Sequence, residues 1–276
     1  MLVADKLCGK KMPSTKRGAC KLCSEEKELR NSHVFPRSYT KYLKRGNGQL
    51  VKVLVDEKTK PSKSNSDAKE RLLCHKCEQF LSKYYENYGT RLFKNKKTIE
   101  ELPTAIIYNN FQYKKFYLYL ISILWRASLS TLENYAMVNL PQSINDLLRK
   151  SITHQKIELN AGMRVDDFIK IGVLKIFDKT GKIPENTISK IFLNINIEVT
   201  KNYHDGILYY FMIDGHLVLY YLYPAKSVKD AKSMQIIGQL ENGPSIIVPK
   251  IDFGEIKQIH ESFAAVQRKF KEYGIL

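Results

Sequence analysis

The chain has 276 residues, of which 43% are hydrophobic and 26% are charged, and its formal net charge is +17 at pH 7. This composition is typical of a globular protein with a hydrophobic core, and it excludes a disordered chain. The length suffices for one large domain or two ordinary ones. Five cysteines in a chain of this length exclude a scaffold held together by disulfides.

The positive charge is concentrated in the first third of the sequence. Residues 1–100 contain 24 Lys and Arg against 11 Asp and Glu, whereas residues 101–276 contain 21 against 17. A concentrated positive field favours a polyanion as partner, and nucleic acid is the first candidate. The alternative is a lysine-rich, solvated surface without such a partner.

Two pairs of cysteines give the strongest functional signal. Cys20 and Cys23 form one Cys-x2-Cys pair, Cys74 and Cys77 form the other, and 50 residues separate the two pairs. Four thiolates in this pattern can surround one tetrahedral ion, and zinc is the metal that suits four sulfur ligands. We therefore predict a structural Zn²⁺ site, with four free thiols in the core as the alternative. Paired metal-binding cysteines are typical of a reducing compartment, so we expect the protein in the cytoplasm.

No segment of the sequence predicts insertion into a membrane. The N-terminus has no apolar run long enough for a signal peptide. The longest apolar run, Phe116 to Trp125, is broken only by Ser122. It is about half as long as the roughly 20 apolar residues that cross a bilayer, so it predicts a buried core helix.

The first hundred residues predict a flexible arm and a small zinc-bound domain, with the boundaries 1–18 and 19–100. In this domain residues 24–28 predict a loop, and strands are predicted at 31–35 and 49–55. Residues 57–67 predict a polar loop. The apolar side chains of residues 80–88 recur every three or four positions, which indicates a helix, and Gly89 is predicted to end it.

Residues 101–276 predict an α+β domain. Residues 104–160 have a helical pattern, with core helices at 111–128 and 143–153. The pattern then changes to strands at 168–177, 191–199 and 245–248, and Asp214-Gly215 predicts a hairpin turn between 208–212 and 217–223. An amphipathic helix is predicted at 253–273. We therefore expect an antiparallel sheet followed by a C-terminal helix.

The predicted order is a turn with the first cysteine pair, then strands, then the second cysteine pair at the start of a helix. This is the order of a treble-clef zinc finger. With the motif Ser-His-Val-Phe-Pro at 32–36 and Leu-Cys-His-Lys-Cys-Glu at 73–78, residues 20–88 resemble HNH endonucleases of the cysteine-flanked type. The resemblance implies a ββα-metal-like site that hydrolyses phosphodiester bonds, in DNA more than in RNA. It also implies that His33 is the general base and that Mg²⁺ or Mn²⁺ binds at the helix.

Three positions depart from the pattern of that family. Glu78 stands where the family often has His, Ser32 replaces an acidic or His neighbour of the base, and the family's Asn has no counterpart. Glutamate is a competent ligand for hard cations, and Glu86 shares a helix face with Glu78. We predict catalytic roles for His33, Glu78 and Glu86 around one hydrated divalent ion. Each residue also has a non-catalytic alternative. His33 could be a structural histidine, Glu78 a carboxylate favoured by the helix dipole, and Glu86 a surface charge.

A basic and aromatic stretch follows the histidine motif. Its cations alternate with tyrosines at 39 and 42, a pattern that suits contact with a phosphate backbone. The alternative is a solvated basic loop. The predicted nucleic-acid-binding residues are Arg37, Lys41, Lys44 and Arg45.

The sequence leaves three functions open. The first is an HNH-like nuclease. The motifs also resemble a group of uncharacterised bacterial HNH-related proteins, some of which lie near mobile elements or phage-defence genes, so the expected setting is antiviral defence or a mobile element. The second is a non-catalytic zinc-finger protein that binds nucleic acid through a decayed HNH site. The third is a protein-interaction scaffold. Residues 101–276 would supply specificity, regulation, or a surface for a homo-oligomer or another protein.

Overall fold

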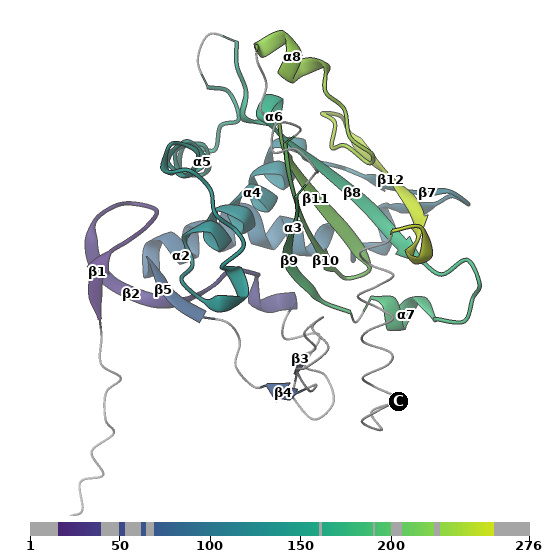
Figure 1. The fold of residues 1–276 in the computed structure, drawn as a ribbon, viewed down its shortest axis with the longest axis horizontal. Helices are drawn as coiled ribbons and strands as arrows, with labels where there is room; N and C mark the ends of the chain where they lie inside the picture. Colours follow the sequence, from purple (N-terminus) through teal and green to yellow (C-terminus); the bar gives the residue numbers. More distant parts are fainter. Residues whose placement is uncertain are drawn as a thin grey trace, which may run out of the picture.

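A computed structural model shows an α+β fold with a small cysteine-bearing sheet, a long central helix and a seven-stranded sheet (Figure 1). The α+β prediction is confirmed, and the large sheet is antiparallel apart from one parallel pair of strands. The structure describes residues 16–39, 50–52, 62–64, 69–159, 162–189, 191–199, 206–223 and 227–256.

The cysteine unit, defined here as residues 16–39 and 69–92, begins with a three-stranded antiparallel sheet. Its strands are β1 (Arg17–Ala19), β2 (Glu26–His33) and β5 (Lys69–Cys74), in the order β1-β2-β5. The loop predicted at 24–28 is wrong from Glu26 onward, because these charged residues pair with β1 at an exposed sheet edge. A separate hairpin joins β3 (Leu50–Lys52), within the predicted strand, to β4 (Ser62–Ser64), within the predicted polar loop.

The helix of the cysteine unit runs from His75 to Leu92 in three parts. These are α2 (His75–Leu81), a π-helical segment η1 (Ser82–Glu86) and α3 (Asn87–Leu92). Gly89 lies inside α3, so the prediction that it ends the helix is wrong. A Cβ at this position would lie 2.1 Å from Cδ1 of Tyr119, so close packing explains the glycine.

The central helix α4 (Tyr113–Leu129) confirms the predicted core helix, and it lies between the cysteine unit and the large sheet (Figure 1). Its residues from Phe116 to Ala127 are all buried. On the sheet side, the Tyr117 hydroxyl donates to the Ile169 carbonyl at 2.8 Å. Of the helices in the described part of the chain, none combines the length and the apolar character that crossing a bilayer requires.

The large sheet has the strand order β6-β7-β12-β8-β11-β10-β9. Neighbouring strands are antiparallel except β12 and β8, which are parallel. The helical pattern predicted from residue 104 is wrong at its start, because residues 105–109 form a strand that pairs with distant residues 245–249. The strands are β6 (Ile99–Glu101), β7 (Ala105–Asn109), β8 (Ile169–Phe177), β9 (Leu193–Val199), β10 (Ile207–Ile213), β11 (His216–Leu222) and β12 (Ser245–Asp252).

The predicted hairpin is confirmed. Asp214 and Gly215 have φ values of 52° and 70°, as a two-residue type I′ turn requires, and β10 pairs in register with β11. The predicted helix at 253–273 begins instead with a short 3-10 turn, η5 (Phe253–Glu255), and its residues from 257 onward lie outside the described residues. The remaining helices are η2 (Lys96–Thr98), η3 (Glu133–Tyr135), α5 (Gln142–His154), α6 (Val165–Phe168), α7 (Glu185–Ile188) and α8 (Val228–Ser233).

One hydrophobic core extends through the cysteine unit, α4 and one face of the large sheet. Phe35, just after β2, packs against Phe192 and Phe211 with ring centroids 4.9 and 5.0 Å apart. A smaller core on the other sheet face includes Leu174 and Ile188. The predicted domain boundary after residue 100 falls within β6, and the larger core is continuous across it.

His216 on β11 is a buried, neutral histidine. The Asp214 carbonyl lies 2.8 Å from its Nδ1, so Nδ1 carries the proton and Nε2, at 2.6 Å, accepts from the Tyr108 hydroxyl. Burial, followed by the charge of Lys175, lowers the pKa of His216 well below its ordinary value. Protonation of the ring in the folded state would place a positive charge in a buried site. The two hydrogen-bond partners of the ring, the Asp214 carbonyl and the Tyr108 hydroxyl, are both uncharged.

We therefore expect the free energy of unfolding to fall as the pH drops below about 6.5, the ordinary histidine pKa. The unfolded chain binds the proton there and the folded chain does not, so the slope contributed by His216 approaches about 1.4 kcal/mol per pH unit. Urea unfolding between neutral and mildly acidic pH should show a shallower pH dependence for His216→Gln. The matched control is His154→Gln at an exposed position. Equal slopes for wild type and His216→Gln would contradict the prediction.

Candidate metal centre and buried polar cluster

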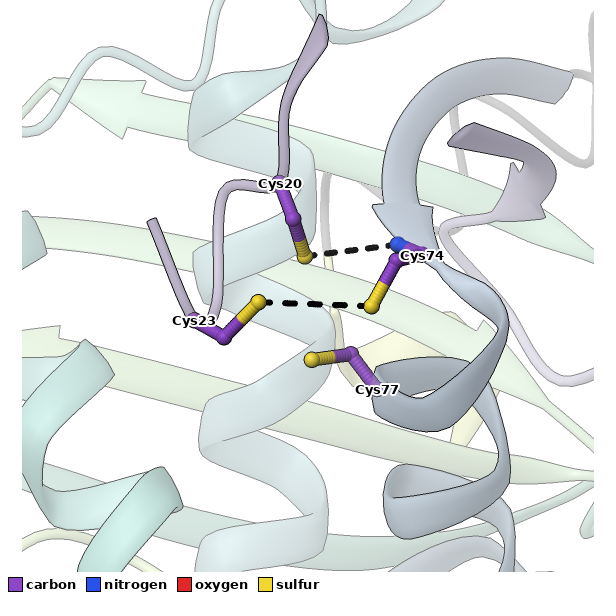
Figure 2. Close-up of side chains that lie close together, drawn as sticks. All are labelled: Cys20, Cys23, Cys74 and Cys77. Atoms are coloured by element: carbon purple, nitrogen blue, oxygen red, sulfur yellow. Dashed lines mark hydrogen bonds between the residues drawn. The ribbon is translucent and has the colours of Figure 1, made fainter. Parts of the chain in front are cut away.

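The four paired cysteines come together at the junction of two strands and a helix. Cys20 directly follows β1, Cys23 lies in the turn before β2, Cys74 ends β5, and Cys77 lies in the first turn of α2. Figure 2 shows the four side chains pointing toward one another, and their Sγ atoms all lie within 4.8 Å of each other. The Cys23 and Cys74 sulfurs are 4.0 Å apart, close to the separation of about 3.8 Å that a tetrahedral zinc site requires.

Backbone hydrogen bonds shape the turn that presents the first pair. Ser24 N–H donates to the Cys20 carbonyl at 2.8 Å, and Lys21 N–H donates to the Leu72 carbonyl at 2.9 Å. The Cys74 N–H donates to the Cys20 sulfur at 3.3 Å. This contact ties the two cysteine pairs to each other through the main chain, and N–H···S bonds of this kind orient metal ligands.

The electrostatics of the sulfur cluster favour a bound cation. Burial raises the pKa of Cys20, but backbone N–H groups, including that of Cys74, outweigh it and lower the pKa below its ordinary value. Burial, followed by the charge of Cys20, raises the pKa of Cys77. Four thiolates this close together repel one another, and a bound cation would offset both this repulsion and the burial that raises the pKa of Cys77.

The four predicted zinc ligands thus lie within ligand distance of one another and can bind a metal ion such as zinc. Among the described residues, they are the one group of three or more His, Cys, Asp or Glu side chains close enough to share an ion. His75, between the two cysteines of the second pair, is exposed.

A buried polar cluster adjoins the cysteines, and its centre is Arg126 of α4. The Arg126 side chain is only 2% exposed. Its Nη1 lies 2.8 Å from the His33 carbonyl oxygen and 2.8 Å from Oε1 of Glu86, and its Nε donates to the Ser122 carbonyl at 3.1 Å. The guanidinium therefore joins the end of β2 to the end of the π segment.

Glu78 faces the same cluster from the first turn of α2. Burial raises the pKa of its carboxyl group, while a hydrogen bond from Ser32 and the charge of Arg126 act in the opposite direction. Oε1 of Glu78 and Nη2 of Arg126 are both buried without a hydrogen-bond partner among the described residues. Such atoms are rare in folded proteins, and a site for an ion or a water is one explanation.

The π segment changes which side chains face the cluster. Eight residues of a regular α-helix make about 2.2 turns, which would leave Glu86 about 80° around the helix from Glu78, at the margin of the face that we predicted the two to share. A π-helical segment has more residues per turn and so turns Glu86 back toward the side of Glu78. Thr90, whose hydroxyl donates to the Glu86 carbonyl at 2.7 Å, satisfies a carbonyl near the end of this segment.

The structure brings the side chains of Glu78 and Glu86 near Arg126, whereas His33 reaches Arg126 through its main-chain carbonyl. Among the described residues, the three do not form one set of metal ligands. His33 is the last residue of β2 and Glu78 belongs to α2. Glu86 is held by Arg126, and its side chain is 19% exposed. The catalytic roles of all three stay predictions.

Sequence reasoning did not identify the partner of Arg126. A charged residue at the end of a long apolar run is the one signal that a buried acid pairs with it, but the spacing does not reveal that the acid is Glu86, 40 residues earlier. Of the predicted nucleic-acid contacts, Arg37 is exposed just after β2. Lys41, Lys44 and Arg45 lie outside the described residues.

Three comparisons with known proteins identify no relative of this chain, so its function is inferred from the residues of the site. Comparison with protein-family models finds no match for this chain. Comparisons with curated proteins and with solved structures find none either.

Proposed function

We propose that the chain is a zinc-stabilised, HNH-like, metal-dependent endonuclease that hydrolyses phosphodiester bonds in nucleic acid. The observation that carries the proposal is that two of the predicted catalytic residues belong to the unit that bears the four cysteines. His33 ends β2 and Glu78 lies in the first turn of α2, so both belong to the ββα unit that bears the four cysteines. The order of cysteine turn, paired strands and cysteine-bearing helix is that of a treble-clef finger.

The residues of the cluster fit a hard divalent ion. Mg²⁺ binds through one or two carboxylates together with substrate phosphates, and it keeps several waters. Glu78 offers a buried carboxylate oxygen that has no hydrogen-bond partner among the described residues. Glu78 would therefore be the direct ligand of the ion. Glu86 is bound to Arg126 at 2.8 Å, so it would act on the ion only through its negative charge. When bound, Mg²⁺ or Mn²⁺ stabilises charge on the phosphate oxygens.

The protein's own part in the reaction is proton transfer and positioning. A neutral imidazole at His33 can take a proton from an attacking water near neutral pH. Arg126 fixes the carbonyl of His33, and therefore the end of the strand from which the imidazole projects. Arg37, exposed beyond β2, and the positive charge of residues 1–100 would attract the phosphate backbone.

The second candidate is a zinc-finger protein that binds nucleic acid without cutting it. It is favoured by the burial of His33 Nε2 and Glu78 Oε1, because a phosphodiester reaches these atoms only after the residues that cover them move. In this case the Arg126–Glu86 ion pair would stabilise the finger alone.

The rates at which wild type and His33→Ala cleave nucleic acid distinguish the two candidates. Plasmid and single-stranded DNA and RNA would be incubated with wild type and variant in Mg²⁺, Mn²⁺ and EDTA. We expect wild type to cleave with either ion, and His33→Ala to cleave more slowly by a factor of about 10²–10⁴, the usual share of a general base. The control His154→Ala, at an exposed position of α5, should cleave like wild type.

Zinc content and circular dichroism of each variant establish that it is folded. Intact substrate in every arm, from wild type that is folded and contains zinc, would overturn the nuclease. The binding candidate then requires an affinity for nucleic acid that falls steeply between low and moderate salt.

A further inference from the structure

We infer that Arg126 is a positioning residue for the site on the cysteine unit, and that α4 therefore forms part of the catalytic centre. The inference rests on the proposed nuclease. It assigns a role to a residue that lies outside residues 20–88, the part of the chain that carries the sequence motifs.

The contacts of Arg126 define a clamp with three acceptors. Nε is held by the Ser122 carbonyl at 3.1 Å within α4 itself, which fixes the plane of the guanidinium. From that fixed plane, Nη1 reaches the His33 carbonyl and Glu86 Oε1, each at 2.8 Å. These two acceptors come from segments that are far apart in the sequence, the end of β2 and the end of the π segment.

Burial makes this clamp strong and specific for arginine. The Arg126 side chain is 2% exposed, so its hydrogen bonds do not compete with bulk water. The planar fork of a guanidinium holds its donors in fixed directions, whereas a lysine ammonium is a compact charge on a flexible stem. A lysine at this position could keep the charge opposite Glu86, but it would not hold the His33 carbonyl from the same plane.

The clamp acts on the two elements that carry the proposed catalytic groups. His33 projects from the strand end whose carbonyl Arg126 holds. Glu78 lies one segment before Glu86 on the same continuous helix, and the charges of Arg126 and Glu86 both act on its carboxyl group. Misplacement of such groups by about 1 Å can reduce a rate about a hundredfold, which sets the upper end of the effect expected here.

α4 also packs on the large sheet, so Arg126 connects the two parts of the molecule. The Tyr220 hydroxyl on β11 donates to the Leu120 carbonyl of α4 at 2.7 Å, six residues before Arg126 in the chain. The site on the cysteine unit is therefore held in place from the sheet side. On this inference, residues 101–276 complete the catalytic centre in addition to any role in specificity.

The test uses the full chain with Arg126→Lys, Arg126→Ala and a matched control, Arg149→Gln. Arg149 on α5 also reaches the cysteine unit, at the Leu22 carbonyl, 3.5 Å away, but it does not contact the polar cluster. We expect Arg126→Lys and Arg126→Ala to lower kcat about 10–100-fold, as loss of an orienting partner does, with KM and zinc content unchanged. Arg149→Gln should retain the kcat of wild type.

Two further measurements separate positioning from loss of folding and from failure of the proposed nuclease. Guanidinium chloride, far below the concentrations that unfold proteins, should restore kcat to Arg126→Ala, whereas sodium chloride at equal ionic strength should not. Hydrogen exchange of a peptide covering residues 30–36 should speed up in Arg126→Ala and stay unchanged in Arg149→Gln.

Wild-type kcat in Arg126→Ala would overturn the inference and leave the nuclease standing. If wild type cleaves nothing, the nuclease falls, and hydrogen exchange decides the clamp. Faster exchange at residues 30–36 with zinc retained would support it, and unchanged exchange would overturn it.

Discussion

Removal of the metal from the four cysteines is expected to unfold the cysteine unit and to lower the melting temperature of the whole chain. Structural zinc contributes an apparent free energy of about 10–16 kcal/mol at neutral pH, far more than a small three-stranded sheet can replace. The unit shares a continuous core with the large sheet through Phe35, so its loss exposes apolar surface on both sides. Thermal unfolding with and without a strong chelator measures the effect.

The matched variants are Cys77→Ser at the cluster and Cys8→Ser outside it. Cys77→Ser should bind less than one equivalent of zinc by mass spectrometry of the metal and should melt at a lower temperature. Cys8→Ser should retain full zinc content, since Cys8 is the one cysteine outside the two pairs. Purified wild type that contains no metal, or whose melting temperature is indifferent to the chelator, would contradict the prediction.

Gly89→Ala is expected to destabilise the fold although alanine is the better helix former. A Cβ at residue 89 would lie 2.1–2.4 Å from three ring atoms of Tyr119, which is itself buried in α4. Alanine gains about 1 kcal/mol of helix propensity over glycine. Overpacking of a rigid core costs about 1–3 kcal/mol or more. Because backbone of α3 or the Tyr119 ring must shift here, we expect a cost of about 3 kcal/mol and therefore a net loss of about 2 kcal/mol in urea unfolding.

Two controls assign that loss to the contact with Tyr119. Gly243→Ala should change the stability little, because the nearest atom to its new Cβ is 3.5 Å away. In a Tyr119→Ala background, where the ring is gone, Gly89→Ala should cost less or become stabilising. A cost that is the same in both backgrounds would show that the contact is not its cause.

The features that the sequence predicted well are set by residues close together in the chain. Two residues between the cysteines of each pair suffice to place both sulfurs on one turn, and the structure brings both pairs together. Asp214 and Gly215 adopt the positive φ that the hairpin turn requires. The apolar run from Phe116 to Trp125 became the buried part of α4, because such a run can be covered only inside a core.

The features that the sequence did not predict depend on partners far away in the chain. Residues 105–109 form a strand because β12 lies beside them, and no local pattern signals that neighbour. Gly89 has its role through Tyr119, 30 residues later, so a rule about helix ends misreads it. Glu86 resembles a surface charge or a metal ligand until Arg126 is placed against it.

The position of β12 has a consequence for how the chain reaches its fold during synthesis. β12 lies between β7 and β8, so residue 245 pairs with residue 109 and residue 250 pairs with residue 175. Until residue 252 has left the ribosome, the nascent chain has one open edge on β7 and another on β8. Unpaired edges of this kind recruit other strands, and contacts over such long sequence distances form slowly. Chaperone dependence and aggregation during expression should therefore respond most to changes in residues 245–252.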